Sequence, residues 1–307
     1  MPKQETIATK TPEAPKLRSG RYSDGHPLDD LQYLECKLIL KPDRFTSAKV
    51  FQEFGEVVGR AAKKFDIGFS TKGVVLQPEI REVLFLDTEG YRLYNNAFIL
   101  RRRIAYENGF PVSDPEMVLK FRHSDMQKAA EVDVRPSIAG EYKIKFKAEA
   151  LPLKDQLGGY RLLFSHNVEL NLSQVPDMDR TSLPKLGEIF PCLSSLKKHK
   201  DEKVEYVNNT IVEEVLQDIG TLDFGKGITA NSNLALWRER GMHRPLCGEF
   251  AFQVKAKRRD DVHDKAIEHI KQFFVGLQQT AHEWLSLGTT KTGLVYRLKG
   301  NPPQAHE

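Results

Sequence analysis

Six segments of the chain alternate between apolar and charged residues, and this pattern restricts the fold more than any other feature. In a β-strand, side chains i and i+2 share a face. In the segment 142–151, for example, Phe146 opposes Lys145 and Lys147. The other five segments are 33–38, 97–104, 117–122, 130–135 and 249–257. The pattern predicts a mostly antiparallel sheet in which each strand has one apolar and one charged face.

Two longer stretches have the apolar spacing of amphipathic helices. They cover residues 47–64, with Phe54 and Val58 on one side, and about 261–285, with Ile270 and Phe274 on one side. Strands 117–122 and 130–135 are expected to pair as a hairpin. The remaining predicted elements are a short helix at 183–196 and strands at 80–86, 168–172, 234–238 and 293–298. Many strands with few helices predict an α+β fold, either a barrel or a strongly curved sheet.

The charged faces of the six segments are mostly basic. They carry 11 Lys or Arg residues against five Asp or Glu residues, although the whole chain has a net charge of only +4. One interpretation is a single sheet that packs on helices by its apolar face and exposes its charged face to water. The other is a closed, mostly antiparallel β-barrel with a charged tunnel and helices outside. Because like charges are costly to enclose, the barrel implies an anionic guest, and Arg and Lys are the usual ligands of phosphate oxygens.

The composition excludes several other classes of protein. No stretch approaches the roughly 18 apolar residues that span a bilayer, and the N-terminus has no apolar run of the kind found in secretory signals. Three cysteines without CxxC spacing argue against a disulfide framework and a structural zinc site. We expect a cytoplasmic protein with a disordered tail at 1–28, one domain at 29–300 and an expanded insertion at about 152–230.

The order of the motifs resembles the CYTH family, the triphosphate tunnel metalloenzymes. That family includes thiamine-triphosphatases, inorganic triphosphatases and class IV adenylate cyclases. Its E-x-E-x-K strand corresponds to Tyr33–Lys37, and its later R-x-R strand corresponds to Arg101–Arg103. A Lys-containing strand at 118–122, an acidic strand at 131–133 and a Lys-Thr-Gly end at 291–293 follow in the expected order. The resemblance covers about residues 31–150 and 234–298.

Two departures from the family pattern affect the acidic residues. Tyr33 stands where the first acid of E-x-E-x-K belongs. Phe252 and Val254 stand where the late strand of the family has two acids, unless a bulge moves Glu249 or Gln253 into place. The resemblance therefore implies that the phosphate-binding half of the site is intact, whereas the metal-binding half is depleted.

The resemblance and the strand faces together assign roles to individual residues. Metal binding and catalysis fall to Glu35, Glu131 and Asp133, which would hold Mg²⁺ or Mn²⁺ and orient a water for attack on phosphorus. The residues expected to bind phosphate oxygens are Lys37, Arg101, Arg103, Lys120, Arg122, Lys145, Lys147, Lys255 and Lys257.

Three functions stay open at this point. The first is binding, with metal-dependent hydrolysis, of a triphosphate or another phosphorylated small-molecule anion; the depleted acids predict slow or absent hydrolysis. The second is a non-catalytic binding protein for polyphosphate, nucleotide or RNA, with nucleic acid less favoured. The third is a scaffold whose charged face is simply solvated. The pattern specifies neither the substrate nor the oligomeric state.

Overall fold

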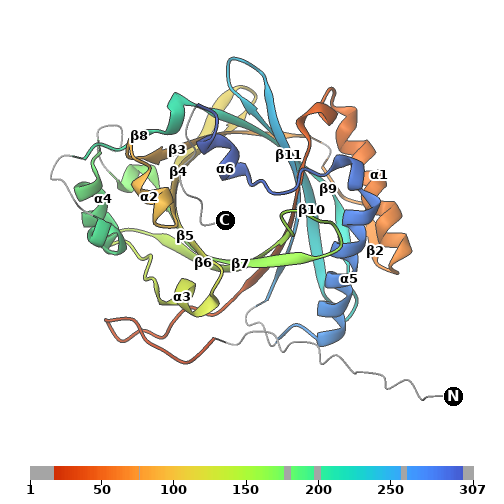
Figure 1. Cartoon of the computed structure of the whole chain (residues 1–307), viewed down its shortest axis with the longest axis horizontal. Coiled ribbons are helices and arrows are strands. Elements are labelled where there is room, and N and C mark those ends of the chain that lie inside the picture. Colours follow the sequence, from red (N-terminus) through yellow and green to blue (C-terminus); the bar gives the residue numbers. More distant parts are fainter. Residues whose placement is uncertain (1–16, 76, 176–180, 197–201, 257–260, 300–307) are drawn as a thin grey trace.

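The computed structural model of the chain describes residues 17–75, 77–175, 181–196, 202–256 and 261–299. Within these residues, a ring of nine strands closes into a barrel, because β3 pairs with β9 as well as with β4. Figure 1 looks down this ring. Its strands, in spatial order, are β1 (Tyr33–Leu40), β6 (Tyr142–Pro152), β7 (Tyr160–Asn171), β5 (Phe110–His123), β4 (Phe98–Glu107), β3 (Glu79–Asp87), β9 (Val212–Asp223), β10 (Thr229–Glu239) and β11 (Pro245–Lys255).

The barrel is mixed but mostly antiparallel, which confirms the predicted fold class. Only β1 and β6 pair in parallel among the strands of the ring. The short strands β2 (Gly68–Ser70) and β8 (Glu205–Tyr206) extend the sheet beside β9 and β3. The segment 152–230, which was expected to be an insertion, supplies the barrel strands β7 and β9.

The alternation in the strands separates the inside of the barrel from the outside. On β1, Glu35 and Lys37 line the interior, whereas Cys36 and Leu38 are buried in an outer apolar core. Glu35 of β1 is paired in register with Glu149 of β6. Inward-facing charged residues of neighbouring strands therefore lie side by side. The two-residue period of each strand therefore places the charges inside a closed barrel.

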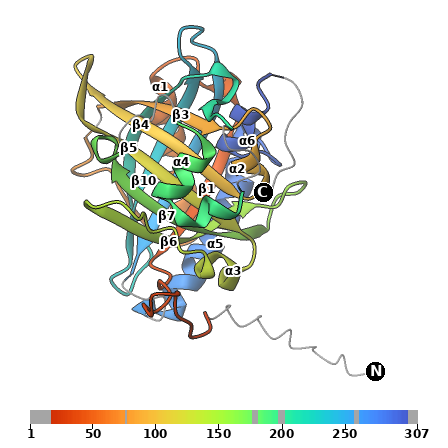
Figure 2. The same cartoon turned by 90° about the vertical axis from the view of Figure 1, so that its left-hand side faces the viewer.

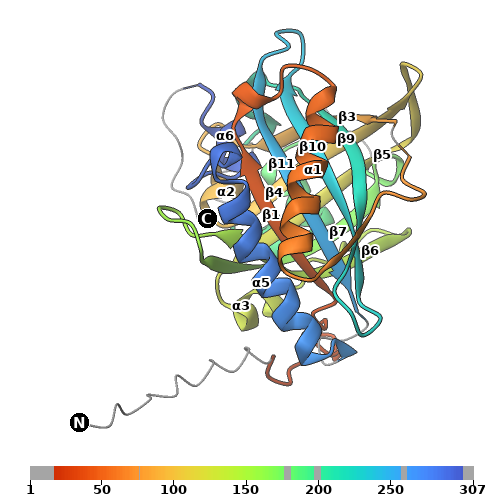
Figure 3. The ribbon, with the colours of Figure 1, turned by 90° about the vertical axis from the view of Figure 1, so that its right-hand side faces the viewer.

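Helices α1 (Lys49–Lys64) and α5 (Asp264–Thr280) lie side by side on the outer face of one half of the barrel (Figure 3). Phe54 of α1 and Phe273 of α5 pack there against Phe250 and Phe252 of β11. Val254 is buried in the same core. Phe252 and Val254 thus point away from the barrel interior, and Glu249 on the opposite face of β11 lines it.

The opposite wall of the barrel is covered by α4 (Leu183–Ile189) and the 3₁₀ turn Pro191–Leu196 (Figure 2). Leu183 and Leu186 pack there against Leu100 and Leu119 of the neighbouring strands β4 and β5. The predicted helix at 183–196 is confirmed, with a break between its two parts. No helix of the described residues is long and apolar enough to cross a membrane.

The predicted strand at 130–135 is wrong. Helix α3 (Met126–Glu131) occupies its first part, and the strand β5 pairs with β4 and β7 instead. The side chain of Asp125 accepts a hydrogen bond from the backbone N–H of Lys128 and so caps this helix. An N-cap and two adjacent alanines favour a helical turn, and this local preference prevails over a short run of alternating residues.

The predicted strand at 293–298 is also wrong, because helix α6 (Lys291–Tyr296) forms there. The hydroxyl of its N-cap residue Thr290 accepts a hydrogen bond of 3.0 Å from the N–H of Gly293. Val295 and Tyr296 of α6 pack against the inward-facing Ile39. They form one buried apolar core with inward side chains of β3, β4 and β10, so α6 and these side chains fill one end of the barrel interior.

This apolar end is fixed by a buried carboxylate. Asp87, at the end of β3, accepts hydrogen bonds of 2.9 Å from the N–H groups of Leu93 and Tyr94 in α2 (Arg92–Asn95). It also accepts one of 3.1 Å from the hydroxyl of Tyr296. A single side chain thus ties β3, α2 and α6 together at the closed end.

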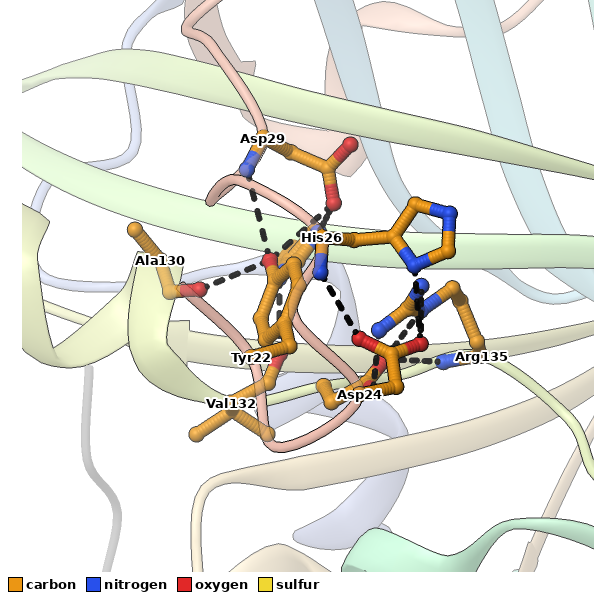
Figure 4. A network of polar contacts seen from close by, with 9 residues as sticks. Tyr22, Asp24, His26, Asp29, Ala130, Val132 and Arg135 are labelled. Carbon is orange, nitrogen blue, oxygen red and sulfur yellow. Dashed lines mark hydrogen bonds and ion pairs between the residues drawn. The ribbon is translucent and has the colours of Figure 1, made fainter. Parts of the chain in front are cut away.

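The described part of the expected N-terminal tail, residues 17–28, packs against α3, whereas residues 1–16 lie outside the described residues. Tyr22 is buried, and its hydroxyl lies 2.9 Å from the carbonyl oxygen of Ala130 and 3.0 Å from Asp29 (Figure 4). The ring of His166, on the outer face of β7, lies 3.0 Å from the same carboxylate. Arg135 stacks over the Tyr22 ring and pairs with Asp24. Polar contacts therefore attach this segment to the barrel wall.

Replacing Asp29 by Ala is expected to lower the free energy of unfolding at neutral pH by about 1–3 kcal/mol, because it leaves the buried His166 ring nitrogen without its partner. Burial acts to raise the pKa of Asp29, but the hydrogen bond and charge of His166 outweigh it and lower that pKa. The contribution of Asp29 is therefore present above its unfolded pKa and is lost as pH falls through its folded pKa.

Urea unfolding of the wild type and the Asp29→Ala variant at several pH values checks this prediction. The matched control is Asp24→Ala, since Asp24 is exposed and its ion pair with Arg135 is screened by solvent, so its loss should change stability much less. A stability difference that stayed constant from neutral pH into acid would contradict the role given to the Asp29 carboxylate.

Candidate functional site

The interior of the barrel contains a cavity of about 220 Å³. Its described lining carries nine basic and five acidic side chains, so basic residues outnumber acidic ones by four. The acidic residues are Glu35, Glu149, Glu169, Glu214 and Glu249. The basic residues are Lys37, Arg81, Arg101, Arg103, Lys120, Arg122, Lys145, Lys147 and Lys291.

The structure brings most of the residues expected to bind phosphate into this cavity. They are Lys37, Arg101, Arg103, Lys120, Arg122, Lys145 and Lys147, and Glu35 of the expected metal set joins them. Lys255 does not line the cavity; it is exposed at the end of β11, beside the ring of Tyr33. Lys257 lies outside the described residues.

The structure does not bring Glu131 and Asp133 to the cavity. Glu131 is exposed at the end of α3 and accepts a hydrogen bond from Gln127. Asp133 follows α3 and forms an ion pair of 2.6 Å with Arg135. Because α3 packs on the outside of the barrel, the expected carboxylate set of Glu35, Glu131 and Asp133 is divided by the barrel wall.

Several lining residues were absent from the predicted site. Glu149 and Glu249 lie on the charged faces of their alternating segments, so the same signal contained them. Glu214 and Arg81 belong to strands without a clear alternation of charge. Lys291 belongs to a helix in a Gly/Thr-rich segment, where no local pattern marks a residue as inward-facing.

Glu149 is the centre of a buried ion network. Its carboxylate contacts Lys120, accepts a hydrogen bond of 3.1 Å from Arg122 and lies 3.6 Å from the amine of Lys37. The hydroxyl of Ser165 donates to it at 2.8 Å. Burial acts to raise the pKa of Glu149, but Lys120, Lys37 and Arg122 hold it well below its usual range. Glu149 is therefore ionised at neutral pH and balances part of the surrounding positive charge.

A second ion network joins α6 to the barrel. The amine of Lys291 lies 2.7 Å from Glu249 and 3.3 Å from Glu214. It also stands over the ring of Trp237, 4.4 Å from the ring centroid, and the indole N–H donates to Glu214 at 2.6 Å. Two carboxylates thus neutralise one lysine between the charged cavity and the apolar end.

Arg101 differs from the other cations of the cavity. The described residues supply no acidic side chain within ion-pair distance of it, and its Nε is buried without a hydrogen bond. Burial and the adjacent Arg103 lower the pKa of Arg101 to about 10, so the guanidinium stays charged at neutral pH. Arg103 itself pairs with Glu116 at 2.5 Å. Arg101 is therefore a charged donor inside the cavity with unused hydrogen-bonding capacity.

At the end of β1 remote from α6, Tyr33 lies between two lysines. In the strand register Tyr33 is flanked by Lys255 of β11 and Lys147 of β6. Their amines stand 5.8 and 5.5 Å from the centroid of the tyrosine ring. The aromatic ring of Tyr33 thus lies between two cations, and it places no carboxylate there for a metal ion.

The residues of the cavity do not fit a divalent metal ion. Mg²⁺ is held by several oxygen ligands in octahedral geometry, but within the described ranges no three His, Cys, Asp or Glu side chains converge on one point. The inward carboxylates are already paired: Glu35 with Lys37 at 2.9 Å, and Glu169 with Lys145 at 2.5 Å. Metal binding would have to displace these basic side chains.

Comparison with known proteins gives likenesses of shape only. No family model and no curated protein matches the chain. A proposed adenylyl cyclase from Hippeastrum, described as having a dominant triphosphatase activity, is 13% identical over 90% of this chain and all of its own, with a TM-score of 0.42. A proposed adenylate cyclase from Bacillus halodurans is 10% identical over 85% of this chain and 95% of its own, with a TM-score of 0.37. The PH1819 protein of Pyrococcus horikoshii is 13% identical over 80% of this chain and 89% of its own, with a TM-score of 0.32.

The closed strand order and the basic interior decide the architecture. The chain forms a closed nine-stranded barrel with a charged, mostly basic interior. One end of the barrel interior is closed by α6, and the charged cavity lies beside that closure. At this end the cavity is therefore bounded by the buried apolar side chains that pack against α6.

Proposed function

We propose that the barrel cavity binds a short phosphate chain, such as tripolyphosphate or the triphosphate group of a nucleotide, without a divalent metal ion. The observation that carries this proposal is the surplus of four basic over acidic side chains in the cavity, with Arg101 lacking an acidic partner among the described residues. Enclosed like charges repel one another and are stabilised by an anion of opposite charge.

The charge of the ligand matches the surplus in the cavity. A triphosphate carries roughly four negative charges at neutral pH, since its terminal phosphate has a pKa near 6. Two arginines, Arg101 and Arg103, offer planar donors that bind phosphate oxygens in pairs. Lys145 and Lys147 add mobile point charges on the same face of β6. Each phosphoryl group of the chain can therefore meet at least one of these cations.

Metal-dependent hydrolysis is the less supported function of this cavity. It requires a metal to polarise the phosphate and to activate a water, and the inward carboxylates that would hold the metal are engaged by lysine and arginine. We therefore propose anion binding as the activity of the chain, with slow or absent turnover.

Calorimetric titration with tripolyphosphate in EDTA tests this function. Binding is expected with a dissociation constant on the order of 1–100 μM, equivalent to about 5–8 kcal/mol, and it should weaken as the salt concentration rises. Addition of excess Mg²⁺ should weaken binding, because the metal neutralises the ligand. Orthophosphate is the control and should bind more weakly, since it spans fewer cations. Binding that occurred only with Mg²⁺ would contradict the proposal.

A further inference from the structure

A second cavity lies outside the barrel, between its wall and helix α5. It has a volume of about 140 Å³ and shares no side-chain chemistry with the charged interior. The strands β1 and β6 line both cavities, but with opposite faces: Glu35 and Glu149 point inward, whereas Cys36 and Ala150 face this outer space. The two cavities are therefore separated by the thickness of one sheet.

The outer cavity exists because small side chains lie beneath α5. Ala148 and Ala150 of β6 and Cys36 of β1 face the helix at a place where Ile270 and Phe274 approach from above. Elsewhere under α1 and α5 the space is filled by phenylalanines. The space is partly open to solvent, and a concave apolar surface of this kind is typical of a binding site for a small molecule.

The lining is apolar apart from its edge. Among the described residues that line it, Lys271 of α5 is the only side chain that is charged at neutral pH. Lys271 is half-buried, and it takes part in no ion pair or hydrogen bond with the described residues. Tyr160 of β7 adds a phenol that packs edge-on against Phe274, with ring centroids 6.4 Å apart. The cavity thus combines an apolar interior with one unpaired cation.

From this juxtaposition we infer that the outer cavity binds a small aliphatic carboxylate, whose chain enters the apolar space and whose carboxylate pairs with Lys271. An apolar cavity of about 150 Å³ in another protein holds a benzene molecule, so this one has room for about six carbon atoms. A wholly apolar ligand would make no use of the ammonium of Lys271, whereas a carboxylate pairs with it. This inference does not rest on anion binding inside the barrel.

The test is calorimetric titration with the sodium salts of butyrate, hexanoate and decanoate. Affinity is expected to rise by about fourfold for each methylene that enters the cavity, and to level off once the chain outgrows it, between hexanoate and decanoate. Hexanol serves as the uncharged probe of the same length. An affinity that did not depend on chain length would overturn the inference.

Two variants separate this site from the barrel interior. Lys271→Met keeps the aliphatic stem but removes the charge, and it should weaken hexanoate by about tenfold or more while changing hexanol by less than about twofold. Ala148→Leu should fill the space and abolish binding of both probes. A cooperative urea unfolding transition shows that Ala148→Leu is folded; if it does not fold, Lys271→Met decides the question alone.

The barrel cavity is itself basic and can also attract a carboxylate, so competition with tripolyphosphate distinguishes the two sites. Saturating tripolyphosphate should leave hexanoate affinity unchanged, and Arg101→Ala should leave it unchanged too. Displacement of hexanoate by tripolyphosphate would overturn the inference. A change in the oligomeric state of Ala148→Leu, measured by light scattering, would also overturn it, because the cavity would then be part of an interface between chains. Failure of tripolyphosphate to bind would contradict the proposed function without affecting this site.

Discussion

Replacing Glu149 by Gln is expected to lower the free energy of unfolding by about 3–5 kcal/mol, since breaking a buried ion network by removing one partner leaves uncompensated charge. Glu149 is 1% exposed, and it balances Lys37, Lys120 and Arg122 at once. Gln preserves the shape of the side chain but neutralises it, so the loss measures charge rather than packing. Urea unfolding at neutral pH and low salt gives the difference directly.

Two comparisons make this prediction specific. Glu116→Gln is the matched control, because Glu116 also pairs with an arginine of the cavity but is half-exposed, and it should cost less than about 1 kcal/mol. Tripolyphosphate should raise the melting temperature of Glu149→Gln more than that of the wild type, because the ligand supplies negative charge that the variant lacks. If Glu149→Gln and Glu116→Gln lowered the free energy of unfolding equally, Glu149 would have no special electrostatic role.

Replacing Arg101 by Ala is expected to weaken tripolyphosphate binding by roughly 30- to 150-fold, corresponding to about 2–3 kcal/mol for the loss of charged hydrogen bonds to the ligand. The free protein should be as stable as the wild type or more so. Arg101 has no acidic partner to leave behind among the described residues, and its removal relieves repulsion with Arg103. Titration calorimetry and urea unfolding on the same samples measure both effects.

The neighbouring residue provides the control for Arg101. Arg102→Ala removes the same charge from the same strand, but Arg102 lies on the outer face of β4, where it stacks over Tyr206. It should leave tripolyphosphate affinity within about twofold of the wild type, since Arg102 lies on the opposite face of the strand from the cavity and cannot contact the ligand. If Arg101→Ala and Arg102→Ala weakened binding equally, the ligand would be attracted by the overall charge of the barrel and not bound inside it.

The inward direction of most site residues could be predicted from the sequence. Lys145 and Lys147 alternate with Ile144 and Phe146, so recognising the strand is enough to place both lysines on one face. The same reasoning placed Arg101 and Arg103 together, and the structure brings all four into one cavity. These assignments succeed because the two-residue period of a strand is a property of its own backbone.

At both predicted strands that were wrong, the cap of a neighbouring helix was missed. At 130–135 the alternation was short, and Asp125 caps a helix that competes with it. At 291–296 the cap is Thr290. A cap contributes about 1 kcal/mol, which is enough to change the state of a segment of six residues but is invisible to an argument based on periodicity.

By itself, then, the sequence determined the elements with long periodic patterns, the basic character of one face of each strand and the α+β class. Only the tertiary structure decided which faces meet. The pairing of β3 with β9 closes the ring, the order β6–β7–β5 carries Glu149 to Lys120, and α6 closes one end. Each of these depends on contacts between residues far apart in the chain. A local pattern cannot encode them, because their free energy arises only when the whole barrel has formed.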